Sequence, residues 1–211
     1  LFRSFDKGGY YCIREKDTFS FIRCGRHKDR PAHADNLHLD IWYQGENCLF
    51  DGGSYKYNTT EKLLRYFMGT ESHNTIMLEG HDQMLKGDRF IWYNWSQAEW
   101  SSLKETEDTY IFEGKVSCFT YLNKKIKHYR KIVKWKNTCK WEIEDCIDGN
   151  PKNMNMRQLW HTNKDNLSLE SNGETIDTEQ LCSNYYGQTT KCRQIEFQTK
   201  NSSIKTILQF I

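Results

Sequence analysis

"RPAHADNLHLDIWYQGENCLFDGG", residues 30–53, is the stretch that decides the fold. In an extended chain Leu37 and Leu39 lie on one face, and the polar residues that alternate with them lie on the other. This alternation is typical of a half-buried β-strand. A tight turn at Gly45 leads into a second alternating run. The stretch therefore predicts a β-hairpin whose second strand ends in a carboxylate, Asp51, followed by two glycines.

The same period-two alternation continues along the rest of the chain. Alternating segments follow one another about every 10–15 residues, with Gly, Asn and Asp turns between them. Residues 59–69, TTEKLLRYFMG, are the one stretch that favours a short helix, with Thr59 or Thr60 as its N-cap. Aromatic residues make up 14% of the chain and proline occurs twice, which suits pleated sheets. We therefore predict one all-β domain over residues 1–211, a large antiparallel β-sandwich (super-sandwich-like) with at most one or two short helices.

Composition excludes several classes of function. A net charge of +2, with 27% charged residues, provides no strong field for nucleic acid or a membrane surface. The sequence contains no run of about 18 apolar residues that could span a bilayer. Eight cysteines show neither a CxxC pair nor zinc-finger spacing, so free thiols are the favoured interpretation and a Cys182–Cys192 disulfide is the alternative. Because Leu1 begins within a strand-like pattern, we expect a fragment of a longer protein.

Histidine and aspartate side chains lie where several of these predicted strands begin or end. In strand geometry His33 and Asp35 fall on the face that buries Leu37, so each needs a partner to offset its desolvation. Asp51 ends the next strand, and His73 begins another in TESHNTIML. Two histidines and one aspartate form a set of ligands that zinc accepts, with a fourth position left for water or substrate. From spacing alone, structural histidines with satisfied hydrogen bonds are the commoner explanation.

Two longer strings resemble a known family. HADNLHLDIWYQGENCLFDGGSYKYN, followed by YFMGTESHNTIMLEGHDQM, closely resembles the C-terminal β-sandwich domain of the heparinase II/III-like family. Members of that family are polysaccharide lyases that act on heparin-like, heparan or alginate-type polymers. The resemblance implies zinc, or another divalent metal, held by His33, Asp51 and His73, with Asp35 supporting an imidazole or the strand end. In the family this metal is mainly structural and shapes the wall of the substrate cleft.

The resemblance also implies what this chain needs from elsewhere. The family's cleft lies between the sandwich and an N-terminal α/α toroid, which supplies Tyr, His and Asn groups. The isolated domain should therefore have little or no activity, and the parent protein is expected to be bacterial and periplasmic or secreted. Family members usually read H-x-H-x-D, with the first His at the reaction centre, whereas Pro31 occupies that position here. A proline side chain cannot transfer a proton, so a lyase built on this chain needs a different base.

Other residues are weaker candidates for a site. The catalytic candidates are His27, which could replace the missing base, and Tyr55 and Tyr57, for which hairpin packing is an equally good explanation. The substrate-binding candidates are Asn74 and Gln83, whose amides could hydrogen-bond sugar hydroxyls.

The residues and the resemblance together lead to two functional hypotheses. The first is a metal-binding domain of a lyase that cleaves an acidic, uronic-acid-containing polysaccharide (heparin- or heparan-type glycosaminoglycan, or alginate) by β-elimination. The alternative is a noncatalytic module that binds carbohydrate or serves as a scaffold, and Pro31 favours it. His128 and His161 carry no motif and are predicted on strand surfaces.

Overall fold

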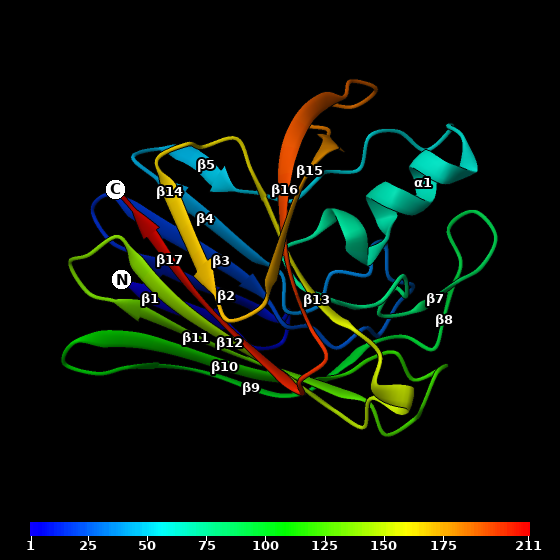
Figure 1. Ribbon diagram of the computed structural model, residues 1–211, viewed down its shortest axis with the longest axis horizontal. Helices are drawn as coiled ribbons and strands as arrows, with labels where there is room; N and C mark the ends of the chain where they lie inside the picture. Colours follow the sequence, from blue (N-terminus) through cyan, green and yellow to red (C-terminus); the bar gives the residue numbers. More distant parts are fainter.

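The computed structural model describes residues 1–211 except for the side chain of Lys152. Its first five strands form one antiparallel sheet in chain order (Figure 1). These strands are β1 (Phe2–Phe5), β2 (Tyr10–Arg14), β3 (Thr18–Arg23), β4 (Leu39–Tyr43) and β5 (Glu46–Leu49). The predicted hairpin around Gly45, now β4–β5, is confirmed, and β2 and β3 pair as a second hairpin.

A six-stranded antiparallel sheet forms the second layer. From edge to edge it consists of β14 (Leu167–Ser171), β17 (Ser203–Phe210), β12 (Lys140–Asp148), β11 (Lys127–Trp135), β10 (Thr109–Ser117) and β9 (Gln97–Glu105). A third sheet consists of β15 (Glu174–Cys182), β16 (Thr190–Thr199), β13 (Met156–Thr162) and β6 (Ile76–Leu78). A short ribbon pairs β7 (Leu85–Lys86) with β8 (Trp92–Tyr93). Successive strands therefore lie side by side from β9 to β12, after which the chain passes to the third sheet.

The first two sheets pack face to face around the main core. Every second residue of β11 and β12 is buried, as alternation requires. Trp141 of β12 is fully buried, and its indole nitrogen donates to the hydroxyl of Ser20 in β3 (2.9 Å). The rings of Tyr43 and Phe210 stack with centroids 4.5 Å apart. Such contacts between facing sheets define a β-sandwich, so the predicted fold class is confirmed.

One α-helix, α1 (Glu61–Met68), forms where the sequence favours it. The hydroxyl of Thr60 accepts a hydrogen bond from the Leu63 N–H, which confirms Thr60 as the N-cap. Short 3₁₀ turns, η1 (Thr70–Ser72) and η2 (Pro151–Asn153), complete the helical content. In Figure 1 α1 lies at the end of the molecule opposite both termini. Within the described structure, no helix is long and apolar enough to cross a membrane.

The strand that follows His33 begins later than its pattern indicates. Residues 36–37 form a turn, Leu37 adopts a φ of +62°, and β4 starts at Leu39. His33 and Asp35 therefore lie in a loop, and the predicted face shared with Leu37 is wrong. The strand β15 was not predicted, because most of its side chains are exposed on both faces and show no apolar alternation.

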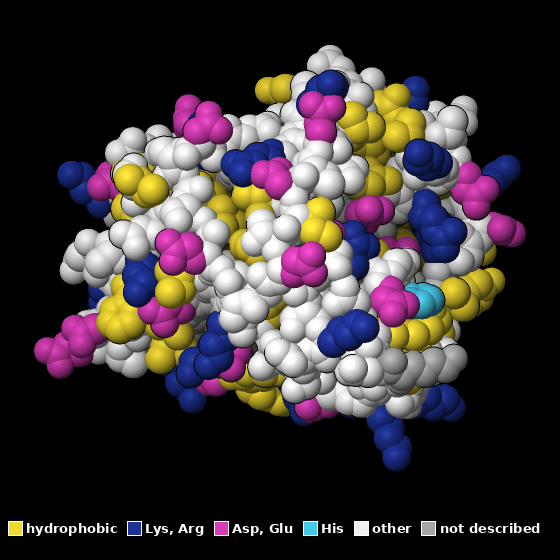
Figure 2. All heavy atoms as spheres, viewed as in Figure 1, with side chains coloured by type: hydrophobic (Ala, Val, Ile, Leu, Met, Phe, Trp, Pro, Cys, Tyr) yellow, Lys and Arg dark blue, Asp and Glu magenta, His cyan; other side chains and the backbone are white. Residues whose placement is uncertain are grey.

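Burial corrects one further prediction, the placement of two histidines. His128 and His161 are fully buried rather than on strand surfaces, because they face neighbouring layers. In the part of the chain that the structure describes, all eight cysteines are free, and Cys182 and Cys192 are buried together beside Phe50. Figure 2 shows acidic and basic side chains interspersed over one face of the molecule, in keeping with the small net charge.

Candidate metal centre

Three segments that are distant in sequence meet at the candidate metal centre. His33 lies in the loop between β3 and β4, Asp51 follows β5, and His73 comes directly after η1. One ligand atom from each residue lies within 4.8 Å of the ligand atoms of the other two. The structure thus brings together the three residues that the sequence analysis singled out.

The buried ring of His73 is oriented by a main-chain carbonyl. Its Nδ1 lies 2.7 Å from the carbonyl oxygen of Gly69, which can only accept, so Nδ1 carries a hydrogen. In the neutral ring Nε2 then presents its lone pair. This Nε2 lies 3.2 Å from Oδ2 of Asp51 and 3.2 Å from Nδ1 of His33. A lone pair that faces a carboxylate oxygen needs a cation there, either a proton or a metal ion.

Electrostatics identify which group holds the proton in the metal-free protein. Burial alone would lower the pKa of His73, but the Asp51 carboxylate raises it to about 9. Burial alone would raise the pKa of Asp51, but His73 holds it well below its usual range. Burial, and then the neighbouring His73, lower the pKa of His33. Without metal, His73 is therefore the protonated member of an ion pair with Asp51.

The other two candidate ligands are also held by the protein. Nε2 of His33 lies 3.2 Å from the hydroxyl of Ser54, which leaves Nδ1 directed toward His73. Oδ1 of Asp51 accepts the Gly53 N–H (2.6 Å), while Oδ2 faces His73 and the side chain is 37% exposed. Each ligand thus has its second polar atom hydrogen-bonded to the chain, the support that metal ligands usually receive.

The donor set fits a divalent metal of the zinc type. Two ligand atoms at about 2.0–2.2 Å from a tetrahedral ion lie roughly 3.3–3.6 Å apart. The separations of 3.2 Å around His73 Nε2 are close to that value. Two imidazole nitrogens and one carboxylate oxygen match the ligands of zinc and leave a fourth position free.

The two glycines after Asp51 let its loop approach other segments closely. The Gly52 N–H donates to the carbonyl of Ser72 (2.8 Å), and the Gly52 carbonyl accepts from Ser183 N–H (2.8 Å). Gly53 has a φ of +83°, and a Cβ there would lie 2.1 Å from the Ser183 carbonyl oxygen. The loop that carries Asp51 is therefore packed between the segment of His73 and the end of β15.

We expect Gly53→Ala to destabilise the protein by more than about 2 kcal/mol, because a left-handed backbone and a steric clash act together. Gly45→Ala is the matched control, since Gly45 shares the φ of +83° but its added Cβ meets nothing within 4 Å. That control should cost about 1–2 kcal/mol. Urea unfolding measures both variants, and equal losses would contradict the close approach.

Zinc binding should strengthen with pH through the neutral range. His73 has a pKa of about 9 and is protonated below it, so its proton must leave before a metal can bind. We therefore expect the apparent affinity to rise about tenfold per pH unit from about pH 6 to about pH 8. Chelator competition at several pH values measures this slope. An affinity independent of pH would show that His73 is not the protonated group.

Asp35 and His27, the two remaining polar candidates of this region, lie at the edge of the site. Asp35 pairs with Arg23, the last residue of β3 (2.8 Å), and so ties the His33 loop to a strand end. His27 is half-buried, and burial lowers the pKa of its imidazole. It is not among the residues that line the pocket beside His33.

The pocket beside His33 has a volume of about 470 Å³, and only one of the two candidate tyrosines lines it. Tyr57 lines it and is 68% exposed. Tyr55 lies outside its lining and packs its ring against Phe67, with centroids 5.5 Å apart. Of the two, Tyr57 is the one that lines the pocket.

Asn74 and Gln83 are fully buried rather than exposed to a substrate. The Asn74 amide hydrogen-bonds main-chain groups of three segments, and the Gln83 amide bonds both main-chain groups of Asn36. Because these bonds occupy both amides in the interior, the structure does not place either residue where a polysaccharide could reach it.

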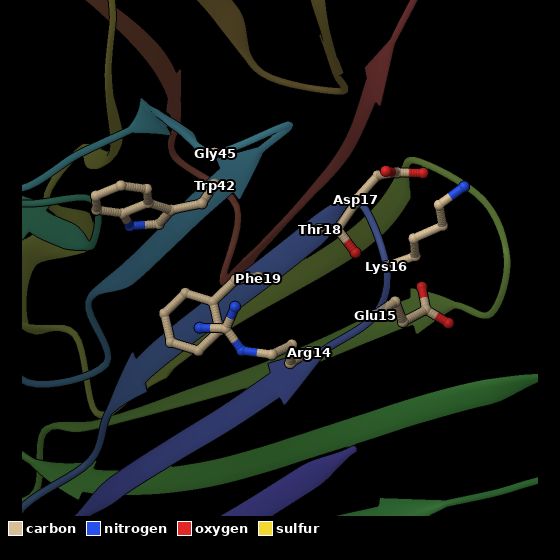
Figure 3. A pocket seen from close by; sticks show the side chains of 8 residues that line it. All are labelled: Arg14, Glu15, Lys16, Asp17, Thr18, Phe19, Trp42 and Gly45. Atoms are coloured by element: carbon tan, nitrogen blue, oxygen red, sulfur yellow. The ribbon is translucent and has the colours of Figure 1, made fainter.

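A smaller hollow, of about 210 Å³, lies at the β2–β3 turn beside the β4–β5 turn (Figure 3). There the guanidinium of Arg14 lies over the ring of Phe19, 4.5 Å from its centroid. The lining contains neither His nor Cys among the described residues, so this hollow is a hairpin surface and not a second candidate centre.

Sequence reasoning missed His38, which lies against the centre. Its ring is almost perpendicular to that of His73, with centroids 5.7 Å apart, and its Nδ1 accepts the Asn74 N–H (2.9 Å). Burial lowers the pKa of His38 to about 3, so the ring stays neutral. Alternation had assigned it to the polar face of a strand. The turn at residues 36–37 directs His38 into the interior instead, and the alternating pattern of the sequence does not indicate this turn.

Comparisons with known proteins agree with this architecture. Heparinase III, the BT4657 gene product, superposes with a TM-score of 0.80 at 17% identity, covering 100% of this chain and 36% of that one. Heparan sulfate lyase HepC from Pedobacter heparinus gives 0.79 at 15% identity, covering 99% and 36%. At these identities the likeness shows the fold, and the chain spans about a third of the length of those proteins. No curated protein sequence matches. The family model "Heparinase II/III-like, C-terminal" matches residues 1–207, and the chain therefore belongs to that family.

Proposed function

We propose that this chain is the metal-binding sandwich domain of a polysaccharide lyase that cleaves uronic-acid-containing polysaccharide by β-elimination. The observation that supports the proposal is the cluster of His33, Asp51 and His73 at the edge of an open pocket. His33 belongs to both, because it is a candidate ligand and also lines the pocket. A relative with the same fold is named as a heparan sulfate lyase.

The pocket offers a cation and exposed aromatic rings. The guanidinium of Arg30 lies 5.7 Å from the centroid of the Phe90 ring, and both residues line the pocket. Tyr57 meets Phe90 edge-on and lies next to Tyr186, with centroids 5.8 and 5.9 Å apart. Aromatic faces pack well against the C–H faces of sugars, and a guanidinium pairs with carboxylates and sulfates. An acidic polysaccharide suits such a surface.

β-Elimination makes specific demands on these groups. A base removes the C5 proton of the uronate, the electrons form a C4–C5 double bond, the C4–O bond breaks, and an acid protonates the leaving oxygen. In this proposal Arg30, which lines the pocket, neutralises the uronate carboxylate and so makes the C5 proton more acidic. The hydroxyl of Tyr57, also in the lining, would protonate the leaving oxygen. Pro31 lines the pocket without a proton acceptor, so the base comes from another part of the full-length protein.

A bound divalent ion would supply positive charge that fixes the carboxylate of Asp51 and the rings of His33 and His73 as one wall of the pocket. A second hydrogen bond orients each candidate ligand: Asp51 accepts one from the Gly53 N–H, His33 shares one with the Ser54 hydroxyl, and His73 donates one to the Gly69 carbonyl. The Arg30 side of the pocket would thereby keep a constant distance from the Asp51 loop.

Release of unsaturated uronate, followed by ultraviolet absorbance, tests the proposal with the full-length protein. Heparin, heparan sulfate and alginate are offered in turn. We expect release from one of them, with a reduced rate for Tyr57→Phe and Arg30→Gln. Tyr185→Phe, an exposed tyrosine outside the pocket lining, is the control and should act as wild type. No release from any acidic polymer would reject the lyase.

The placement of Pro31 in the pocket lining favours a second candidate, a noncatalytic module. In that case the pocket would bind an acidic polysaccharide without cleaving it. Binding of the same polymers to the isolated chain, with no elimination by the full-length protein, distinguishes the module from the lyase.

A further inference from the structure

Asn74 joins all three segments that carry the candidate ligands. It follows His73 directly and is fully buried. Its Nδ2 donates to the carbonyl of Leu39, in the first strand after His33, at 2.9 Å. The same nitrogen donates to the carbonyl of Phe50, the residue before Asp51, at 3.2 Å. One side chain thus bonds the residue before Asp51 and the start of the strand that follows the His33 loop, both from the interior.

The orientation of the Asn74 amide is unambiguous. Its Oδ1 accepts the main-chain N–H of His161 at 2.7 Å, and an N–H can only donate. Oδ1 also lies 3.0 Å from Nδ1 of His161, so the amide is bonded on both its oxygen and its nitrogen. Burial lowers the pKa of His161 to about 3, which leaves that ring neutral and able to donate from Nδ1.

A second interior group holds the same segments. The guanidinium of Arg130 on β11 is fully buried and donates to the carbonyls of Leu37 (2.6 Å) and Asn74 (2.7 Å). Its other nitrogens form two bonds of 2.7 Å to the carboxylate of Asp145 on β12. Through Arg130, the loop of His33 and the segment of His73 are therefore hydrogen-bonded to the middle of the six-stranded sheet.

We propose that Asn74 is a positioning residue, which sets the spacing of His33, Asp51 and His73 for a metal ion, and that Arg130 is its anchor in the sheet. The inference rests on the metal site of the proposed function. A metal with short, directional bonds tolerates only small errors in ligand position, and hydrogen bonds outside the ligand set usually control them. Here those bonds go to the main-chain carbonyls of Phe50 and Asn74, which adjoin Asp51 and His73, and to those of Leu37 and Leu39, which end the His33 loop.

Two variants separate positioning from folding. Asn74→Leu keeps the number and branching of the side-chain heavy atoms and removes all the amide's bonds. Arg130→Lys keeps the charge beside Asp145 but loses the planar group that reaches two carbonyls at once. Lys134→Met is the matched control: Lys134 is also fully buried and makes three hydrogen bonds, but to Glu15, Trp135 and Thr138.

The experiment measures zinc affinity by chelator competition and records the visible absorption of the cobalt-substituted protein, which reports ligand geometry. Circular dichroism confirms folding of each variant. We expect zinc affinity to fall by about 10- to 100-fold in Asn74→Leu and in Arg130→Lys, with an altered cobalt spectrum. Lys134→Met should bind zinc within about twofold of wild type even though it is less stable.

Wild-type affinity and an unchanged cobalt spectrum in both variants would overturn the inference while leaving the metal site intact. If Asn74→Leu does not fold, Arg130→Lys alone decides, since it retains the buried ion pair. A wild-type chain that binds no metal would remove the proposed site itself, and the positioning role with it.

Discussion

Replacing Asp145 with alanine should lower the free energy of unfolding by about 3–5 kcal/mol. Asp145 is fully buried between Arg130 and His128, whose Nε2 lies 2.7 Å from its carboxylate. Gln158 adds a bond of 2.6 Å. Burial alone would raise the pKa of Asp145, but Arg130 and His128 hold it well below its usual range. Removal of the carboxylate leaves the guanidinium buried and without its counter-charge.

The adjacent residue of the same strand provides the control for this prediction. Glu144 pairs with Lys205 on the surface, where the two side chains are 34% and 66% exposed. Because water screens such a pair, Glu144→Ala should change stability by less than about 1 kcal/mol. Urea unfolding of both variants measures the difference. A loss of less than about 1 kcal/mol for Asp145→Ala would show that the buried pair does not support the core.

Zinc should stabilise the folded chain by about 4 kcal/mol when its free concentration is a thousandfold above its Kd. The three candidate ligands come from segments that only the folded chain brings within 4.8 Å, so an ion held there would bind the native state in preference to the unfolded chain. In His73→Ala this increment should disappear, because the nitrogen that faces both other ligands is lost.

For each variant, the free energy of unfolding is measured with zinc and after chelator treatment. The difference between the two values isolates the contribution of zinc, because the effect of the substitution itself is present in both samples. His81→Ala is the matched control: His81 is half-buried, lies outside the ligand set, and lines a different pocket. It should retain the full increment. An increment that survives in His73→Ala, or that is lost in His81→Ala, would place the metal elsewhere.

The elements of the fold that alternation specifies were predictable from the sequence. In β12 and β17 buried residues alternate with more exposed ones without a break, and the Thr60 cap marks the start of α1. The missed elements lack such a signal. β15 is a mostly exposed strand that pairs only with β16, so its side chains carry no apolar face. The turn before β4 depends on a left-handed Leu37, a conformation that no residue preference indicates.

The candidate ligands could be predicted from the sequence. The hydrogen bonds that orient them could not. His33, Asp51 and His73 are chemically distinctive residues beside glycines or strand ends, and the family resemblance grouped them. The bonds that orient them come from main-chain carbonyls and from residues such as Arg130, which is 93 positions away from its partner Leu37. A charged residue in an alternating strand is normally assigned to the solvent. Only the packing of the sheets shows that the side chain of Arg130 points into the interior.

Metal content is the measurement that tests the central claim most directly. Untagged protein is incubated with zinc, freed of unbound metal, and analysed by mass spectrometry alongside Asp51→Ala and His73→Ala. The three-residue site predicts about one zinc per wild-type chain and almost none in either variant. A folded wild-type chain without zinc, or variants that retain it, would contradict a metal centre at His33, Asp51 and His73.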